Sequence, residues 1–341
     1  GLGRDEGRGG GRTVLDPRNA LDEVGDPDIE VRDGLAGGPH AELVLDLMGE
    51  SRLAAARAGV CGFKPSYGLV SRSGLVGLIP SMECCGVLSR RLDQVRGILQ
   101  AIAGDDGLDY SLPDEGPPDF TPREIDPKTT TIGVITEASG GLPQTEGLPE
   151  GARELEEAGF SIHEMSFPDY PLFSLVHRIA GAVEASSCAG RYDSVRYGPR
   201  APGARNWNEM YLLSRGAAFG PLVKSYLFQG AFFQFERYGA FEDACRIRAR
   251  LLAGMRQLTA HADFLLLPAG SGAGDGASAS LPGTYAEFAS TLFANVTGQP
   301  ALYLPPGPGR AQGWQLAAPR MGDARLLALG EYLLERRRRG L

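Results

Sequence analysis

The sequence predicts an α/β protein with a mixed, mostly parallel central sheet that helices cover on both faces. Short apolar runs of strand length alternate with longer stretches in which apolar residues recur at helical spacing. Around residues 132–162 the patterns follow the order strand, helix, strand, which is typical of a parallel pair joined by a crossover helix. A chain of 341 residues with 43% hydrophobic side chains can also bury a sizeable core.

The first part of the chain contains one predicted strand and one predicted helix. Residues 43–45 are a short apolar run that leads to a turn at 49–51. In residues 92–102 leucine, valine and isoleucine recur at helical spacing, and Gly104 is predicted to close that helix in the left-handed conformation. Residues 105–130 hold several prolines and aspartates, so we expect a surface connection there.

The middle of the chain carries the strand, helix, strand order. Residues 132–135 are predicted as a short buried strand, and residues 153–159 as a helix that Gly159 ends. A second strand is expected to run through Ile162. Residues 1–10 are rich in glycine and arginine, and we expect them to be disordered.

Composition narrows the function classes. A net charge of −8 argues against direct nucleic-acid binding over the whole surface. The five cysteines show no CxxC spacing and the four histidines are scattered, so we expect free thiols, no metal site and no cofactor. No apolar run reaches membrane-spanning length and no signal-peptide pattern is present, which predicts a cytoplasmic protein without membrane contact.

Two stretches connect the chain to a known family. The segment CGFKPSYGLVSRSGLVG at 61–77 resembles the CGxxGxKPTYG motif of the amidase signature family, and a glycine loop at 33–39 precedes it as in that family. The segments EASS at 184–187 and RYDSVRYG at 191–198 and the motif FGPLVK at 219–224 are similar to those of the family's GatA branch, which supplies the glutaminase subunit of the tRNA-dependent amidotransferase GatCAB.

The resemblance implies one amidase-signature domain over residues 1–341. Its final strands are expected within 262–304 and around Gln315, and its C-terminal helix within 326–334. The segment GRTVLD at 11–16 resembles a GKTNMDEF segment of the family, so the chain is expected to lack the family's N-terminal part and the catalytic lysine on it.

The family's catalytic residues match this chain poorly. When Asp46, Gly49 and Arg52 are laid on the aspartate, second glycine and arginine of the family's GSDTGGSIR motif, the nucleophilic serine falls on Glu50. The relay serine falls on Leu35. A shift of one residue makes Ser51 the candidate nucleophile, against the alternative that it is an ordinary turn serine.

The glycine loop keeps its own candidate role. Gly37 and Gly38 are expected to point backbone N–H groups at a substrate oxygen, as the resemblance implies. Lys64 lies in the KPSYG segment, which is structural in the family, so we do not assign the catalytic base to it.

Substrate-binding residues can be carried over in the same way. Arg248 falls on the arginine that holds the carboxylate of glutamine in GatA, and the alternative is a helix-surface arginine beside Arg246 and Arg250. Tyr197 falls on a tyrosine that contacts glutamine, and it is equally compatible with a place in the core. The aspartate that reads the glutamine amide falls on Phe288.

These expectations give two functional hypotheses, and a third interpretation is a pseudogene product without function. The first is a GatA-like protein that is impaired as an amidase and keeps a binding role, either for partner subunits resembling GatB or GatC or for a small carboxylate or amide such as glutamine. The alternative is an active amidase or glutaminase subunit with Ser51 as nucleophile, whose start lies outside this sequence. The arginines at 336–339 are expected to form a solvated helix end.

Overall fold

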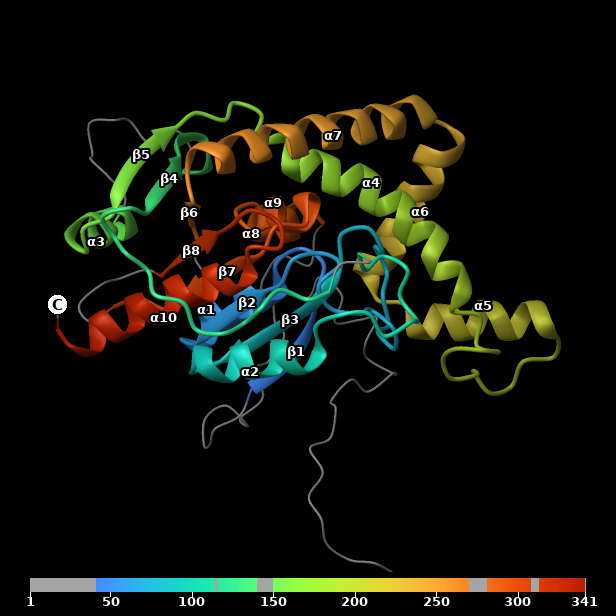
Figure 1. Ribbon diagram of the computed structural model, residues 1–341. Coiled ribbons are helices and arrows are strands. Elements are labelled where there is room, and N and C mark those ends of the chain that lie inside the picture. Colours follow the sequence, from blue (N-terminus) through green and yellow to red (C-terminus); the bar gives the residue numbers. More distant parts are fainter. Residues whose placement is uncertain (1–40, 114–115, 140–149, 270–280, 308–312, 341) are drawn as a thin grey trace, which may run out of the picture.

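The computed structural model describes residues 41–113, 116–139, 150–269, 281–307 and 313–340. They form an eight-stranded sheet with helices on both faces (Figure 1). The strands are β1 (Ala41–Asp46), β2 (Cys61–Lys64), β3 (Cys84–Ser89), β4 (Thr131–Ile135), β5 (Ser161–Met165), β6 (Phe264–Pro268), β7 (Ala301–Leu304) and β8 (Trp314–Ala317). The helices are α1 (Glu50–Ala58), α2 (Leu92–Ile102), α3 (Glu150–Glu157), α4 (Leu172–Cys188), α5 (Trp207–Ala218), α6 (Pro221–Phe235), α7 (Tyr238–His261), α8 (Leu281–Phe288), α9 (Leu292–Thr297) and α10 (Asp323–Arg338).

The sheet is mixed, as predicted, but its pairing is mostly antiparallel. The strand order is β1-β3-β2-β7-β8-β6-β4-β5. In the described residues only the ladders β6–β4 and β4–β5 are parallel, and the other ladders are antiparallel. The expected strand, helix, strand unit is confirmed as β4, α3 and β5, but it is a local feature. Residues 305–313 join β7 to β8 and are too few for the crossover that a parallel pair requires.

Apolar residues lie on both faces of the sheet because helices cover both faces of its central strands. In β6, Phe264 and Leu266 pack with α2, α3 and α10, whereas Leu265 and Leu267 pack with the layer of α4, α6, α7, α8 and α9. This placement follows from the two-residue period of a strand and explains why residues 264–267 read as one apolar run. Helix α1 belongs to the second layer, through Leu53.

Most predicted elements are found near their expected positions. The helix predicted for 92–102 is α2, with the same limits, although Ala103 ends it in extended conformation and Gly104 follows at φ 111°. The predicted strands at 43–45 and 132–135 lie within β1 and β4. The glycine loop at 33–39 and the predicted disordered residues 1–10 lie outside the described residues.

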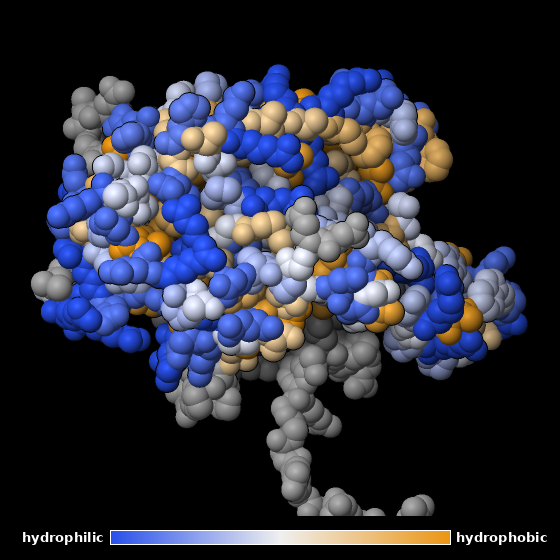
Figure 2. All heavy atoms as spheres, in the orientation of Figure 1, coloured by the Kyte–Doolittle hydropathy of each residue, from blue (hydrophilic) through white to orange (hydrophobic). Residues whose placement is uncertain are grey.

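Helix α6 carries apolar side chains on its outer side as well as its inner side. Val223 and Tyr226 are buried, whereas Phe228, Phe232 and Phe235 are exposed, with Phe228 79% and Phe235 80% accessible. Figure 2 shows apolar surface at the end of the molecule where α6 and α7 lie. No helix in the described ranges is both long and apolar enough to cross a membrane.

Candidate functional site

The turn between β1 and α1 is the centre of the site. β1 ends at Asp46, residues 47–49 form the turn, and α1 begins at Glu50. Gly49 has φ 126°, and a Cβ atom there would lie 2.2 Å from Oγ1 of Thr291, so both the backbone angle and the available space require glycine. The family-like spacing of Asp46, Gly49 and Arg52 therefore has a structural cause.

Glu50 folds its side chain back onto this turn. Its Oε2 atom accepts hydrogen bonds from the backbone N–H groups of Leu47 at 2.7 Å, Met48 at 2.8 Å and Gly49 at 3.1 Å. We call these three donors the N–H nest. The side chain is buried, and its Oε1 atom has no hydrogen-bond partner among the described residues. Burial, together with the charge of Asp46, raises the pKa of Glu50 to about 7.

Ser51 is hydrogen-bonded to Asp46. Its hydroxyl donates to Oδ2 of Asp46, and its backbone N–H donates to the same oxygen at 3.1 Å. The residue is fully buried against Gly86 of β3, where an added Cβ atom would lie 2.5 Å from the Ser51 Cβ. In the described part of the chain, no hydrogen bond joins Ser51 to a lysine or histidine.

Arg52 fixes the turn to the helical layer. One Nη donates to the Thr291 carbonyl at 2.9 Å and to Oε1 of Gln315 at 3.1 Å, and the other donates to Oδ1 of Asn295 at 2.8 Å. The amide of Asn295 in turn donates to Oδ1 of Asp46 at 2.7 Å. Asp46 and Arg52 thus form a pair at 3.7 Å that the buried amide of Asn295 bridges, as a buried charge pair requires.

His177 orients the nest from outside. Its Nε2 lies 3.0 Å from the Leu47 carbonyl and must carry the hydrogen, because a carbonyl only accepts. Nδ1 therefore accepts from the hydroxyl of Tyr285 at 2.9 Å, and Tyr285 accepts from Tyr226 at 3.0 Å. Burial lowers the pKa of His177 to about 4, which keeps this neutral tautomer.

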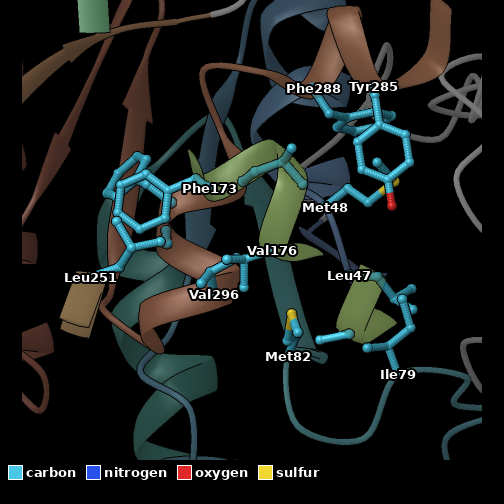
Figure 3. Packing of buried hydrophobic residues seen from close by; sticks show 14 of the residues in the cluster. Leu47, Met48, Ile79, Met82, Phe173, Val176, Leu251, Tyr285, Phe288 and Val296 are labelled. Carbon is cyan, nitrogen blue, oxygen red and sulfur yellow. The ribbon is translucent and has the colours of Figure 1, made fainter. Parts of the chain in front are cut away.

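The nest peptides are held at both ends. His177 holds the Leu47 carbonyl, and the hydroxyl of Thr291 lies 2.6 Å from the Met48 carbonyl. In a trans peptide the N–H points opposite to the C=O, so these contacts aim the N–H groups of Met48 and Gly49 at Glu50. Figure 3 shows Met48 beside Tyr285 and Phe288, which close this region with buried side chains.

Arg248 lies in a different place, on α7 at the wall of a cavity of about 560 Å³. Its Nε donates to the Val296 carbonyl at 3.0 Å, and its Nη groups donate to Oγ and the carbonyl oxygen of Ser81 at 2.6 and 2.8 Å. The alternative of a surface arginine is wrong for this residue. Arg246 and Arg250 are the exposed neighbours, paired with Asp243 and Asp169.

The remaining predicted residues are not gathered at the turn. Tyr197 is 53% exposed and stacks edge-on against Tyr192, so its placement in the core is wrong. Gly37 and Gly38 lie outside the described residues. Phe288 is buried, and Lys64 is buried with its Nζ donating to the Pro65 carbonyl at 2.8 Å.

The arginines at 336–339 lie at the C-terminal end of α10. The solvated helix end is confirmed in part: Arg339 is exposed, but Arg337 pairs with Glu154 and stacks on Trp314. No group of three potential metal ligands occurs in the described residues.

Sequence reasoning missed His177, Tyr226 and Tyr285. They belong to three separate helices and match no motif, so nothing in their local sequence distinguishes them from ordinary core residues. The unusual signal was Glu50 itself, an acidic residue directly after a turn glycine with small apolar residues following.

Comparison with known proteins gives consistent matches. The Amidase family model matches residues 46–327. The A subunit of glutamyl-tRNA(Gln) amidotransferase from Thermus thermophilus is 36% identical over 320 residues, which cover 89% of this chain and 67% of that protein. Its counterpart from Ligilactobacillus salivarius is 32% identical over 86% of this chain and 63% of its own length. The chain thus spans about two thirds of these relatives.

Solved structures agree on the fold. The crystal structure of the A subunit of glutamyl-tRNA(Gln) amidotransferase from Thermotoga maritima matches with a TM-score of 0.66 and 21% identity, over 85% of this chain and 61% of that one. The structure of 6-aminohexanoate cyclic dimer hydrolase matches with a TM-score of 0.65 and 18% identity, over 86% and 64%. At these identities the likeness concerns the fold.

Proposed function

This chain belongs to the amidase family and is GatA-like, and on that premise we propose that it is impaired in amide hydrolysis and acts as a binding protein. The observation that carries the proposal is the carboxylate of Glu50 in the N–H nest. Glu50 occupies the position on which the family's nucleophilic serine falls when Asp46 and Arg52 are matched.

The nest is the kind of site that stabilises an oxyanion during acyl transfer. Backbone N–H groups aimed at one point lower the barrier because they meet negative charge as it develops on the substrate oxygen. Here a carboxylate oxygen already accepts all three of these hydrogen bonds. A substrate oxygen would have to displace it and would meet its charge at close range, so the nest favours no transition state in this form.

Ser51 offers no replacement nucleophile in this arrangement. A serine hydroxyl needs a general base that takes its proton and an open approach to the carbonyl carbon. The hydroxyl of Ser51 donates to Asp46, which also accepts from Asn295 and lies beside Arg52 at 3.7 Å. Asp46 thus already has an amide donor and a guanidinium as partners, and the serine has no exposed surface.

The binding role can involve a small ligand or a partner protein. Arg248 borders a cavity large enough for a ligand of the size of glutamine, and two matched relatives are subunits of an amidotransferase. The exposed phenylalanines of α6 at positions 228, 232 and 235 add apolar surface that a GatB- or GatC-like subunit would cover.

An active amidase is the second candidate, because the chain spans only part of its relatives and its glycine loop lies outside the described residues. In that case the turn must rearrange so that Glu50 leaves the nest and Ser51 reaches a substrate. The two candidates therefore differ in whether Ser51 matters for turnover.

We expect no ammonia release from glutamine or simple amides above background, either with the chain alone or with GatB and GatC subunits added. Parallel assays of Ser51→Ala and of the wild type should give the same trace, because a buried hydroxyl without a base has no part in chemistry. The positive control is a GatA protein that has the family's nucleophilic serine, relay serine and lysine, assayed under the same conditions. Turnover that disappears in Ser51→Ala, with the fold intact by circular dichroism, would overturn the proposal in favour of the active amidase.

A further inference from the structure

Among the residues that the structure describes, the wall of the Arg248 cavity carries three guanidinium groups and no carboxylate. Besides Arg248, its lining includes Arg256 of the same helix and Arg320, which follows β8. Tyr67, Leu252 and Met255 give it an apolar floor. In a chain with a net charge of −8, such a local excess of positive charge creates a field that attracts anions.

The guanidinium groups keep hydrogens free for a ligand. Arg320 donates through Nε and one Nη to the Tyr67 carbonyl, which fixes the group and leaves its other Nη without a partner among the described residues. Arg256 is exposed, and although its carbonyl accepts from the hydroxyl of Thr259, its guanidinium makes no hydrogen bond or ion pair in the described part of the chain. Arg248 uses one hydrogen on each of its nitrogens for Ser81 and Val296, and each Nη retains a second.

The acidic group that lies behind Ser81 already has hydrogen-bond partners. Glu184 accepts from the backbone N–H and the hydroxyl of Ser81, at 2.9 and 2.5 Å, and so lies behind the serine that Arg248 contacts. It offsets part of the charge of Arg248 but does not line the cavity. Within the described ranges Arg256 and Arg320 form no ion pair, which leaves about two positive charges for a ligand to neutralise.

We propose that the Arg248 cavity binds a small organic anion with two or more negative charges, such as a phosphate ester or a polycarboxylate, with Arg256 and Arg320 as its specificity-determining residues. This deepens the binding role proposed above, since Arg248 is common to both, but it does not depend on the loss of amide hydrolysis. Guanidinium forks suit phosphate and carboxylate groups alike, and the apolar floor would receive the carbon skeleton.

The size of the cavity fits this class of ligand. About 560 Å³ lies within the range of small-molecule sites and exceeds what a lone inorganic ion needs. A monocarboxylate such as glutamine would satisfy only one of the three guanidinium groups. We therefore expect affinity to rise with ligand charge at constant ionic strength.

The test is calorimetric titration of the full chain with inorganic pyrophosphate, citrate, acetate and glutamine at one ionic strength. We expect pyrophosphate or citrate, or both, to bind more tightly than acetate and glutamine; which of the two is tighter separates a phosphate site from a carboxylate site. Arg256→Gln and Arg320→Gln should each weaken that binding about tenfold, the loss expected for one charge-assisted hydrogen bond.

The matched control is Arg246→Gln, on the same helix but outside the cavity and paired with Asp243. It changes the net charge by the same amount, so a loss of affinity that comes only from the lower net charge would also appear in this variant. Both cavity residues are exposed, so the variants should fold, and thermal melting checks this. Equal losses in the control and the cavity variants, or no preference for the multivalent anions, would overturn the inference. Detection of amide turnover would leave it intact.

Discussion

Glu50 combines two opposite demands on one side chain. Three backbone N–H groups favour its ionised form, while burial and the charge of Asp46 disfavour it, and the balance raises its pKa to about 7. His177, on the other side of the same turn, has its pKa lowered to about 4 by burial. The two residues therefore contribute to stability with opposite dependence on pH.

The sign of each contribution follows from proton uptake. Glu50 has a higher pKa in the folded state than its ordinary value of 4.5, so its contribution is present below pH 4.5 and is lost as pH rises through about 7. His177 has a lower folded pKa than its ordinary 6.5, so its contribution is present above pH 6.5 and is lost as pH falls through about 4. Each change amounts to about 3 kcal/mol, and between pH 4.5 and 6.5 they largely cancel.

Single substitutions should reveal these two opposing pH dependences of the unfolding free energy. As the pH increases from 4.5 to 6.5, the unfolding free energy of Glu50→Gln should increase relative to that of the wild type. Over the same pH range the unfolding free energy of His177→Gln should decrease relative to that of the wild type. Both replacements keep an acceptor and a donor at the site. Urea denaturation at several pH values measures the differences. Curves that run parallel to wild type would mean that neither group has a shifted pKa.

At the scale of elements, α4 and α6 owe their close packing to one glycine. A Cβ atom on Gly230 of α6 would lie 2.2 Å from the Ala182 carbonyl oxygen and 2.3 Å from the Ser186 Cβ on α4. These are backbone and short side-chain atoms that cannot move aside. The two helices approach so closely because this position lacks a side chain.

Gly230→Ala should destabilise the protein by roughly 1–3 kcal/mol, the usual cost of overpacking, despite the better helix propensity of alanine. Gly216→Ala in α5 is the control, since nothing lies within 4 Å of a Cβ atom there. That change should stabilise the protein by up to about 1 kcal/mol. Chemical denaturation compares the two, and a stabilising Gly230→Ala would refute the close approach.

The sequence predicted elements where a regular pattern was present and failed where tertiary contacts decide. Helix α2 and the unit of β4, α3 and β5 carry clear periodicity, so they were predicted. Helix α1 was missed because its small residues show no apolar stripe, although residues 50–55 are all buried. Strand direction was wrong because alternation of apolar residues does not report which neighbour a strand pairs with.

For the molecule as a whole, the two packed faces of the sheet share the same strands. Adjacent residues of β6 belong to opposite clusters, so separating either helical layer exposes the strand that supports the other. We therefore propose that residues 41–340 behave as one domain. The expectation of a single domain over 1–341 rests on this shared sheet for its described part.

Thermal unfolding should show one transition. Trp314 is buried beneath the α10 layer, and Trp207 is exposed on α5, so a Trp207→Phe variant reports on Trp314 alone. Its fluorescence transition should coincide with that of far-ultraviolet circular dichroism, which follows all helices. Two separated transitions would instead indicate that the layers unfold independently.

The candidate site could be located from sequence but not understood from it. The motif with Asp46, Gly49 and Arg52 pointed to the turn, and the resemblance pointed to Arg248. The side chain of Glu50 folds back onto residues 47–49, and this depends on its rotamer and on the space that the packed neighbours leave. That His177 aims the peptide depends on a contact across 130 positions of the chain. Neither of these two contacts can be predicted from the local sequence pattern.

The group that occupies the N–H nest is the carboxylate of Glu50, which is covalently attached to the same turn. A tethered group competes at an effective concentration that reaches millimolar even for loose linkers, and this linker is a single side chain held in place. A free anion therefore has to bind far more tightly than its intrinsic affinity suggests before it enters. Because the chain itself supplies the group in the nest, we expect the occupancy of the nest to depend little on free anions.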